Sequence, residues 1–210
     1  MITVHLIDDH AMVRAGFRRL LEAEGDIKIV GESGCGETAY PECLKQKPDV
    51  VVVDISMPGE GGLAFMRRIL TKDSEMKLLV MSMHDNETFF AHALQLGAKG
   101  YLTKSGNTDE LVEAVRSIAA GGRWISPEFT QKVANNFGGK YESPVNVLTT
   151  REFEIFLLLS DGKNAHDIGK TLHISPKTVN VHRANLMEKL KVKNTVELAH
   201  IAMRLDMIQA

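Results

Sequence analysis

The chain has 210 residues, a length suited to two domains of ordinary size. Its 44% hydrophobic and 25% charged residues are typical of a globular protein with a buried core, and no apolar run approaches the roughly 20 residues that span a bilayer. Cys35 and Cys43 are the only cysteines, too few for a disulfide framework or a tetrahedral metal site. The first residues lack the basic start of a signal peptide, so we expect a cytoplasmic protein with no membrane partner.

The formal net charge of −2 is unevenly distributed along the chain. Residues 1–123 hold 14 Lys and Arg against 18 Asp and Glu, whereas residues 124–210 hold 11 against 9. Within the second part, residues 163–193 hold seven basic and two acidic residues. A basic stripe of this kind is typical of nucleic-acid binding, although solvated helix faces also carry such runs. The distribution predicts two parts with different tasks.

Short aliphatic runs alternate with segments of helical periodicity over the first 120 residues. We expect strands at Thr3–Ile7, Ile27–Gly31, Val50–Val53, Lys77–Met81 and Lys99–Leu102. We expect helices at Ala11–Glu24, Thr38–Lys45, Leu63–Leu70, Glu87–Leu96 and Asp109–Ala119. Five βα units of this length predict an α/β domain over residues 1–121, with a doubly wound, five-stranded parallel sheet and its ligands at the carboxyl ends of the strands.

The segment 122–146 is expected to connect this domain to a second one. Ser126-Pro127 predicts the start of a short helix reaching about Phe137, and residues 138–144 predict a flexible linker. After it, no strand signal appears. Over residues 147–210 we expect four helices, at Thr149–Leu159, Ala165–Leu172, Pro176–Leu190 and Val196–Met207. They predict a small all-α domain.

Three carboxylates are expected to meet at one edge of the predicted sheet. Asp8 and Asp9 follow the first strand, and Asp54 ends the third, which lies beside it in a sheet of this kind. Like charges packed together need a cation to relieve their repulsion, and an all-oxygen site with few protein ligands suits Mg²⁺. Acids at strand ends also serve as helix caps, so these residues alone do not establish a metal site.

A hydroxyl and an ammonium are predicted to flank the same edge. Ser82 ends the fourth strand, and Lys104 follows the fifth. A carboxylate nucleophile, a divalent cation and a lysine are what phosphoryl transfer requires, because positive charge must surround the phosphoryl oxygens. Five suitable residues, drawn from separate βα units, favour a functional site over helix capping.

Four stretches of this part form a familiar pattern. They are Ile7-Asp8-Asp9-His10, Asp54-Ile55-Ser56-Met57-Pro58 with Gly62, Ser82, and Tyr101-Leu102-Thr103-Lys104. In order and spacing they resemble the receiver domain of bacterial response regulators, whose fold is flavodoxin-like. The resemblance covers residues 1–121. One departure is Ser105, which stands where many receivers carry a proline.

The resemblance implies a role for each site residue. Asp54 would accept a phosphoryl group from a sensor histidine kinase. Asp9, Asp54 and the backbone carbonyl of Ser56 would hold Mg²⁺ directly, with Asp8 acting through water. Ser82 and Lys104 would contact the phosphoryl oxygens, and Tyr101 would move inward with Ser82. His10 is expected to line the pocket or cap the first helix.

A helix-turn-helix pattern lies in the basic part of the tail, where Ser175 and Pro176 begin the second helix of the pair. The inward face of that helix is expected to carry Val179, Leu186 and Leu190. The outward face presents small, amide and basic side chains suited to the major groove of DNA: Lys177, Thr178, Asn180, Val181, Ala184 and Asn185. Phosphate contacts are expected from Arg183, Lys189 and Lys191. A protein-binding helical bundle with a solvated basic face is the competing interpretation.

The fuller pattern of residues 146–210 resembles the four-helix DNA-binding domain of the NarL/FixJ, or LuxR-type, family. It comprises Leu148-Thr149-Thr150-Arg151-Glu152, Gly162, Ile168, Ile174-Ser175, Thr178-Val179, His182, Lys189-Leu190 and Val192. The segment from Ser175 to Leu190 looks most like the hexose-phosphate uptake regulators. Asn164-Ala165-His166-Asp167 departs from the usual Ser-Asn-Lys-Glu, so the resemblance does not carry the family's phosphate contacts over to this turn. Asn180 stands where lysine is commonest, which should change the base preference.

Together the two resemblances imply a phosphorylation-controlled transcription regulator of a two-component system. It would bind a double-stranded DNA operator as a homodimer and act on RNA polymerase. We expect no turnover of a separate substrate. Two alternatives stay open: a haloacid-dehalogenase-like phosphatase, which also uses an aspartyl nucleophile and Mg²⁺ but carries it on the first strand, and a non-phosphorylated receiver that serves as a dimerisation module.

The last predicted helix bears on the homodimer. Its apolar stripe consists of Leu198, Ile201, Ala202 and Leu205, with Val196, Met203 and Met207 beside it. A four-helix domain this small buries only part of such a surface, so we expect some of the stripe to contact a second copy. The alternative is that the whole stripe packs inside the domain.

Overall fold

A computed structural model describes residues 1–83, 87–104, 106–127, 129–131 and 143–208. The chain divides into two compact units, Met1–Gly139 and Lys140–Ala210. Each unit is described by itself below. Within the described ranges, no helix combines the length and the apolarity that crossing a bilayer requires.

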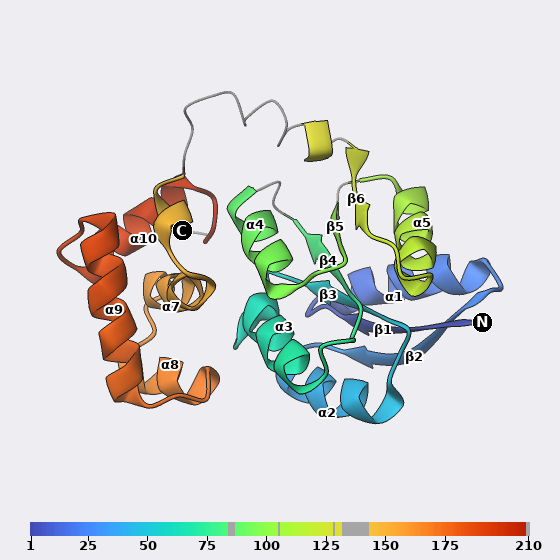
Figure 1. Ribbon diagram of the computed structural model, residues 1–210, viewed down its shortest axis with the longest axis horizontal. Coiled ribbons are helices and arrows are strands. Elements are labelled where there is room, and N and C mark those ends of the chain that lie inside the picture. Colours follow the sequence, from blue (N-terminus) through green and yellow to red (C-terminus); the bar gives the residue numbers. More distant parts are fainter. Residues whose placement is uncertain (84–86, 105, 128, 132–142, 209–210) are drawn as a thin grey trace. The chain divides into compact units, whose positions relative to one another are not determined.

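A parallel sheet forms the centre of the first unit (Figure 1). Its strands are β1 (Ile2–Ile7), β2 (Ile27–Ser33), β3 (Val50–Asp54), β4 (Leu78–Ser82), β5 (Gly100–Thr103) and β6 (Trp124–Ile125). The strand order β2-β1-β3-β4-β5-β6 is that of a doubly wound sheet, as the sequence predicts. The predicted number of strands is wrong, because β6 makes a sixth strand where five were expected.

The additional strand lies at the edge of the sheet beside β5. Gly100 pairs with Trp124 and Tyr101 with Ile125, and the Trp124 amide donates a hydrogen bond to the Lys99 carbonyl at 3.0 Å. A strand of two residues has no periodicity to read, so only pairing with a neighbour defines it. Part of the segment expected to be a connector therefore belongs to the sheet.

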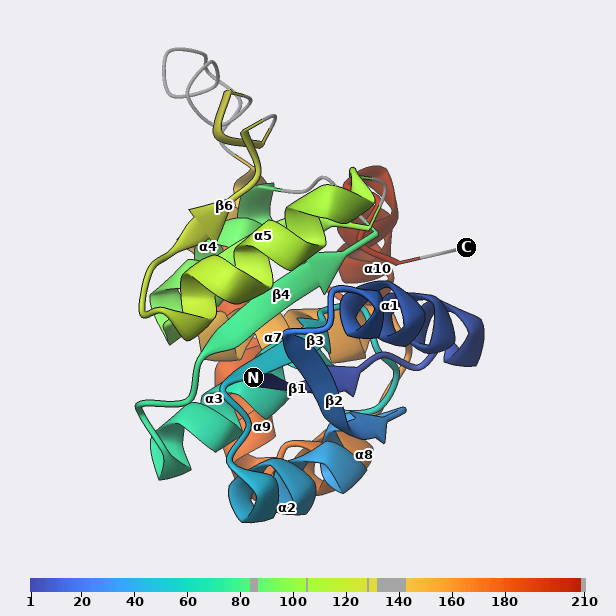
Figure 2. The ribbon, with the colours of Figure 1, turned by 90° about the vertical axis from the view of Figure 1, so that its right-hand side faces the viewer.

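Helices cover both faces of the sheet. They are α1 (Ala11–Ala23), α2 (Gly36–Gln46), α3 (Gly61–Lys72), α4 (Glu87–Leu96) and α5 (Thr108–Ala119). Helices α1 and α5 pack together on one face, seen from their side in Figure 2, whereas α2, α3 and α4 follow one another on the other. Strands β3 and β4 are buried along their whole length, which explains why their sequences are almost purely hydrophobic.

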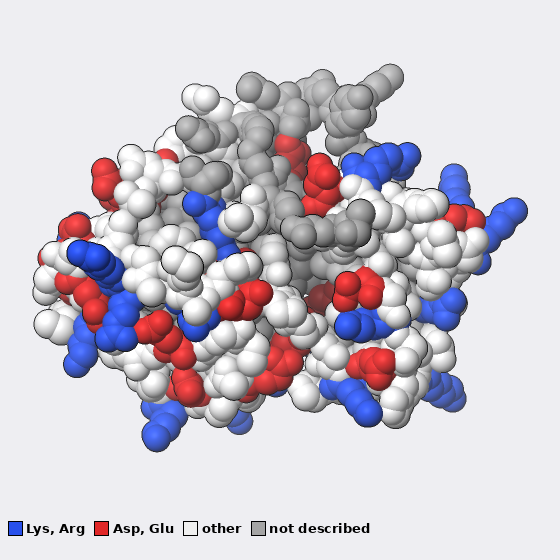
Figure 3. All heavy atoms as spheres, turned by 180° about the vertical axis from the view of Figure 1, so that it is seen from behind, with Lys and Arg blue, Asp and Glu red and all other residues white. Residues whose placement is uncertain are grey.

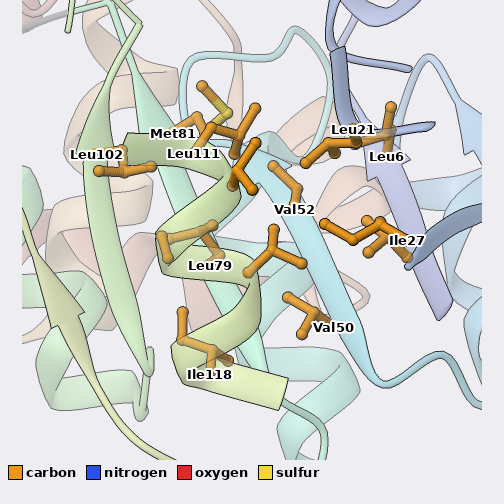
Figure 4. Close-up of a cluster of buried hydrophobic side chains, with 14 of the residues drawn as sticks. Leu6, Leu21, Ile27, Val50, Val52, Leu79, Met81, Leu102, Leu111 and Ile118 are labelled. Atoms are coloured by element: carbon orange, nitrogen blue, oxygen red, sulfur yellow. The ribbon is translucent and has the colours of Figure 1, made fainter. Parts of the chain in front are cut away.

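Beneath α1 and α5, buried side chains from these helices and from the strands form one hydrophobic cluster (Figure 4). Val50 and Val52 of β3 lie between Leu21 of α1 and Ile118 of α5 in one cluster of buried side chains. This cluster holds the strands in register, so that their carboxyl ends lie at one edge.

The short helix predicted after Ser126 begins where expected. Residues 127 and 129–131 are helical, and the Ser126 hydroxyl oxygen accepts a hydrogen bond from the Phe129 amide at 3.2 Å. The predicted end at Phe137 and residues 138–142 of the predicted linker lie outside the described residues.

The second unit is helical, as predicted. A 3₁₀ turn, η1 (Pro144–Val147), precedes α7 (Thr150–Ser160), α8 (Ala165–Thr171), α9 (Pro176–Leu190) and α10 (Thr195–Arg204). The predicted capping box at Thr149 is confirmed, because Glu152 returns a hydrogen bond to the Thr149 amide at 2.8 Å. Helix α10 ends three residues before the predicted Met207, since Asp206 adopts a left-handed conformation with φ of 52°.

Candidate functional site

The acid cluster forms where β1 and β3 end. These strands are paired neighbours, with Ile7 opposite Val53, so Asp8 and Asp54 follow at adjacent positions. One ligand atom from each of Asp8, Asp9, His10 and Asp54 lies within 4.8 Å of the others. The structure therefore brings together the three predicted carboxylates and adds an imidazole to them.

Lys104 lies between two of these acids. Its Nζ is 2.6 Å from Asp8 Oδ2 and 2.7 Å from Asp54 Oδ2, and its side chain is 4% exposed. The Lys104 amide donates to the Ser82 carbonyl at 2.8 Å, which fixes the lysine beside the end of β4. A buried ammonium at this distance balances part of the negative charge of the pocket.

The loop after β3 is shaped around Asp54. The Ser56 amide donates to Asp54 Oδ1 at 3.0 Å, and the Gly62 amide donates to the Ile55 carbonyl at 3.2 Å. A Cβ atom on Gly62 would lie 2.3 Å from the Asp54 carbonyl oxygen, so only glycine fits there. Burial raises the pKa of Asp54, while the hydrogen bond from Lys104 and the one from the Ser56 amide oppose this rise and favour the carboxylate.

Ser82 and Tyr101 lie together under the same edge. Both side chains are fully buried, and the Tyr101 hydroxyl hydrogen-bonds to Ser82. Burial raises the pKa of Tyr101 to about 12, so the phenol stays neutral at physiological pH. Tyr101 thus already lies in the inward position that the resemblance ascribes to it.

The donor set of the cluster fits a hard divalent cation. Asp9 Oδ1 is buried and has no hydrogen-bond partner among the described residues, and the group found beside it is His10 Nδ1, at ion-pair distance. Asp8, Asp9 and Asp54 offer only oxygen ligands, as Mg²⁺ prefers. His10 contributes less to such a site, because its side chain is 62% exposed and its Nδ1 lies 3.1 Å from Asp9 Oδ1.

His10 occupies the N-cap position of α1, but its side chain makes no capping hydrogen bond. Its amide instead donates to Asp8 Oδ1 at 2.8 Å. Asp8 is therefore positioned by the start of α1 as well as by Lys104.

A buried ion pair anchors the loop after β3, and the sequence did not point to it. Glu60 is 5% exposed, and its Oε1 lies 2.5 Å from Arg68 Nη2. The same nitrogen donates to the Gly36 carbonyl at 3.0 Å, and the guanidinium lies 4.2 Å from the centre of the Tyr40 ring. These contacts tie the loop that carries Ser56 to the start of α2. No local signal distinguishes Glu60 from an ordinary exposed loop acid.

Helix α9 presents the predicted surface in the second unit. Val179 and Leu186 are buried, which turns the opposite face outward. The exposed residues on that face are Lys177, Thr178, Asn180, Val181, Ala184 and Asn185. Arg183 is half-buried at the flank. On the face of the molecule seen in Figure 3, basic and acidic side chains are interspersed.

Lys189 is engaged differently from the sequence-based expectation. Its Nζ lies 2.6 Å from Oε2 of Glu152, the buried acid of the capping box of α7. Lys189 therefore ties the end of α9 to the start of α7, and a DNA phosphate would have to compete with this carboxylate. Lys191, which closes α9 in a left-handed conformation with φ of 56°, is exposed and meets no such acid in the described part of the chain.

The apolar stripe of α10 is divided between the inside and the surface. Leu198, Ala202 and Met207 are buried, whereas Ile201, Met203 and Leu205 are half-buried. Val196 is 61% exposed. Part of the stripe packs inside and part stays at the surface, so the alternative in which the whole stripe is buried is wrong. Contact with a second copy stays a prediction.

Comparison with known protein families divides the chain in the same way. Residues 4–116 match the family described as response regulator receiver domain. Residues 146–202 match the family described as bacterial regulatory proteins, luxR family.

Relatives of similar length match over almost the whole chain. The response regulator UvrY of Escherichia coli is 41% identical over 206 residues, covering 97% of this chain and 94% of UvrY. The response regulator GacA of Pseudomonas aeruginosa is 38% identical over 212 residues, covering 100% and 99%.

Solved structures show the same architecture. RcsB from Salmonella enterica serovar Typhimurium, bound to promoter rprA with the phosphomimetic BeF₃⁻, is 25% identical with a TM-score of 0.75 over 99% of this chain and 100% of RcsB. A LuxR-family response regulator from Aurantimonas sp. is 37% identical with a TM-score of 0.64, over 66% of this chain and 99% of that chain.

Proposed function

The chain belongs to the response regulators that join a receiver domain to a LuxR-family DNA-binding domain, and we propose that Asp54 is the phosphoryl acceptor of this transcription regulator. The contact of Lys104 Nζ with both Asp54 and Asp8 carries the proposal. This contact places a carboxylate nucleophile, that of Asp54, beside the fixed positive charge of Lys104.

The phosphoryl donor is a phosphohistidine of a sensor histidine kinase. An Asp54 carboxylate oxygen forms the new bond to phosphorus as the bond to the histidine nitrogen breaks. Lys104 keeps the buried carboxylate ionised before the reaction and then interacts with the phosphoryl oxygens. The Ser82 hydroxyl, at the end of β4, donates to the same oxygens.

Mg²⁺ is the proposed cofactor, and it supplies positive charge to the developing phosphoryl oxygens when bound. Asp9, Asp54 and the Ser56 carbonyl would hold it, with Asp8 acting through water. The grouping of carboxylate oxygens from Asp8, Asp9 and Asp54 within 4.8 Å of one another supports this ligand set.

The proposed output is DNA binding by α9 as a homodimer that acts on RNA polymerase. Phosphorylation adds a charge of about −1.5 to −2 beside Ser82 and Tyr101, which biases the position of both side chains. We place the protein in the cytoplasm, where chromosomal DNA and the polymerase are found.

We propose no turnover of a separate substrate. A haloacid-dehalogenase-like phosphatase carries its nucleophile on the first strand, whereas Asp54 ends β3. A receiver used only for dimerisation is disfavoured because Asp8, Asp9 and Lys104 gather at Asp54, and Ser82 ends the neighbouring strand β4 beside Lys104.

Mass spectrometry of the intact protein tests the assignment. With acetyl phosphate and Mg²⁺, the parent should gain one phosphoryl group and Asp54→Asn should gain none. Asp109→Asn, at an exposed position of α5, is the matched control and should behave like the parent. Equal phosphorylation of parent and Asp54→Asn would rule out Asp54.

A further inference from the structure

The first unit continues beyond residue 116, where the match to the receiver family ends. Strand β6 adds Trp124 and Ile125 to the sheet, and Ser126 then caps a helical turn. Phe129 in this turn is 1% exposed. Residues 124–127 and 129–131, here called the docked segment, thus pack onto the receiver through a buried aromatic side chain.

Phe129 packs against two aromatic rings of the receiver. Its ring centre lies 5.2 Å from that of Tyr101, with an angle of 37° between the planes. It lies 4.7 Å from that of Phe90 in α4, at 61°. Phe90 and Tyr101 are themselves in edge contact at 5.4 Å and 82°. Each ring therefore touches both others, and such pairs stabilise one another beyond simple burial.

The aromatic cluster connects to the proposed phosphorylation site through the Tyr101 hydroxyl. Tyr101 hydrogen-bonds to Ser82, and Ser82 ends the strand beside Asp54, with Met81 opposite Asp54 in the sheet. A continuous series of contacts therefore runs from Ser82 through Tyr101 to Phe129. The series ends in the part of the chain that leads to the DNA-binding unit.

We propose that Phe129 is a positioning residue that holds Tyr101 inward against Ser82, so that phosphorylation and attachment of the docked segment favour each other. This inference rests on the proposed function of Asp54. Without the Phe129 ring, the Tyr101 ring gains room to turn outward, and Ser82 loses a fixed partner. Because coupling between two equilibria is reciprocal, loosening of the docked segment must weaken binding at the phosphoryl site by the same factor.

Binding of BeF₃⁻ with Mg²⁺ to the full-length protein tests the proposal by calorimetry. Phe129→Ala should weaken BeF₃⁻ binding at least threefold, and Phe129→Leu should recover part of the loss because it refills the space beside Tyr101. Gln131→Ala, in the same turn but exposed, is the control and should match the parent. The emission of Trp124, the single tryptophan, should change on BeF₃⁻ binding in the parent and less in Phe129→Ala.

A double-mutant cycle separates positioning from general destabilisation. Once Tyr101→Ala has removed the ring, Phe129→Ala should change BeF₃⁻ affinity no further. An unchanged affinity of Phe129→Ala, or an equal loss with and without Tyr101, overturns the proposal. Asp54→Asn separates a failure of this proposal from a failure of the acceptor assignment. If Asp54→Asn binds BeF₃⁻ as the parent does, Asp54 is not the acceptor. If Asp54→Asn does not bind BeF₃⁻, an unchanged affinity of Phe129→Ala contradicts only the role of Phe129.

Discussion

The acid pocket depends on one ammonium held between two carboxylates. Lys104 Nζ lies within 2.7 Å of both Asp8 and Asp54, and all three side chains are almost fully buried. Removing the lysine leaves two neighbouring acids, whose repulsion a bound cation relieves. Metal binding and output should therefore separate in a variant that lacks only this side chain.

Lys104→Ala should still bind Mg²⁺ but should not respond to phosphorylation with tighter DNA binding. The change removes a charge-assisted contact to the phosphoryl oxygens, worth about 1.5–3 kcal/mol, or on the order of tenfold or more in affinity. DNA titrations with and without acetyl phosphate measure the effect, on an operator selected from random sequences. Lys72→Ala, an exposed lysine of α3, is the control. A parent-like response of Lys104→Ala would contradict its role.

A buried histidine should make the receiver sensitive to acid. His92 of α4 is 3% exposed, and burial lowers its pKa to about 4. Unfolded, it takes up a proton below about pH 6.5, whereas the folded protein resists protonation until about pH 4. Stability should therefore fall as the pH drops through this window, by about 3 kcal/mol at most from this residue.

Urea unfolding followed by Trp124 emission at pH 7 and pH 5 measures this loss. In His92→Gln the difference between the two pH values should shrink, whatever the stability at pH 7. His166→Gln, at an exposed position of α8, should leave the difference unchanged. An identical pH dependence in parent and His92→Gln would show that other groups cause the acid sensitivity.

We expect α9 to read bases near its start and to contact DNA phosphates near its end. Asn180 and Val181 are exposed near its start, and Lys191 is exposed at its end. Lys189 is held by Glu152, so its loss also disturbs the packing of α7 on α9. Lys191 is the cleaner probe of phosphate contacts for this reason.

Asn180→Ala should lose about 1–3 kcal/mol of binding to the selected operator and little to random DNA, because a base contact discriminates among sequences. Lys191→Ala should weaken both equally and reduce the dependence on salt, because it removes a phosphate contact. Fluorescence anisotropy at several salt concentrations distinguishes the two patterns. An equal loss of Asn180→Ala on both DNAs would refute base reading.

For the molecule as a whole, the proposed function requires two copies to assemble on DNA. Val196 is 61% exposed on α10, and Ile201 and Leu205 beside it are half-buried. An apolar surface at the end of a small DNA-binding unit suits a twofold contact with a second copy. The half-sites of the operator should then lie about 10 base pairs apart, one helical turn.

Sedimentation of the phosphorylated protein on a two-site duplex should show two protomers bound. Val196→Lys should lower the affinity with which the second protomer binds, because it places a charge in the apolar contact. Val147→Lys changes a similarly exposed valine in η1 and is the control. A single protomer at saturation would refute the dimer.

Local sequence patterns were enough to predict the order of the elements, the parallel sheet, the four-helix unit and the candidate residues of the acid pocket. Parallel strands end at one edge, so Asp8 and Asp54 had to become neighbours once β1 and β3 were paired. Helix boundaries were readable where caps are local, as at Thr149 and Ser175.

Contacts between residues far apart in the sequence became visible only in the folded protein. Strand β6 exists because β5 offers it an edge, and Phe129 is buried because Phe90 and Tyr101 are there to receive it. The pairing of Lys189 with Glu152 and of Arg68 with Glu60 follows from packing in the same way. Periodicity records which face of an element is apolar, but it carries no information about which side chain from elsewhere will meet that face.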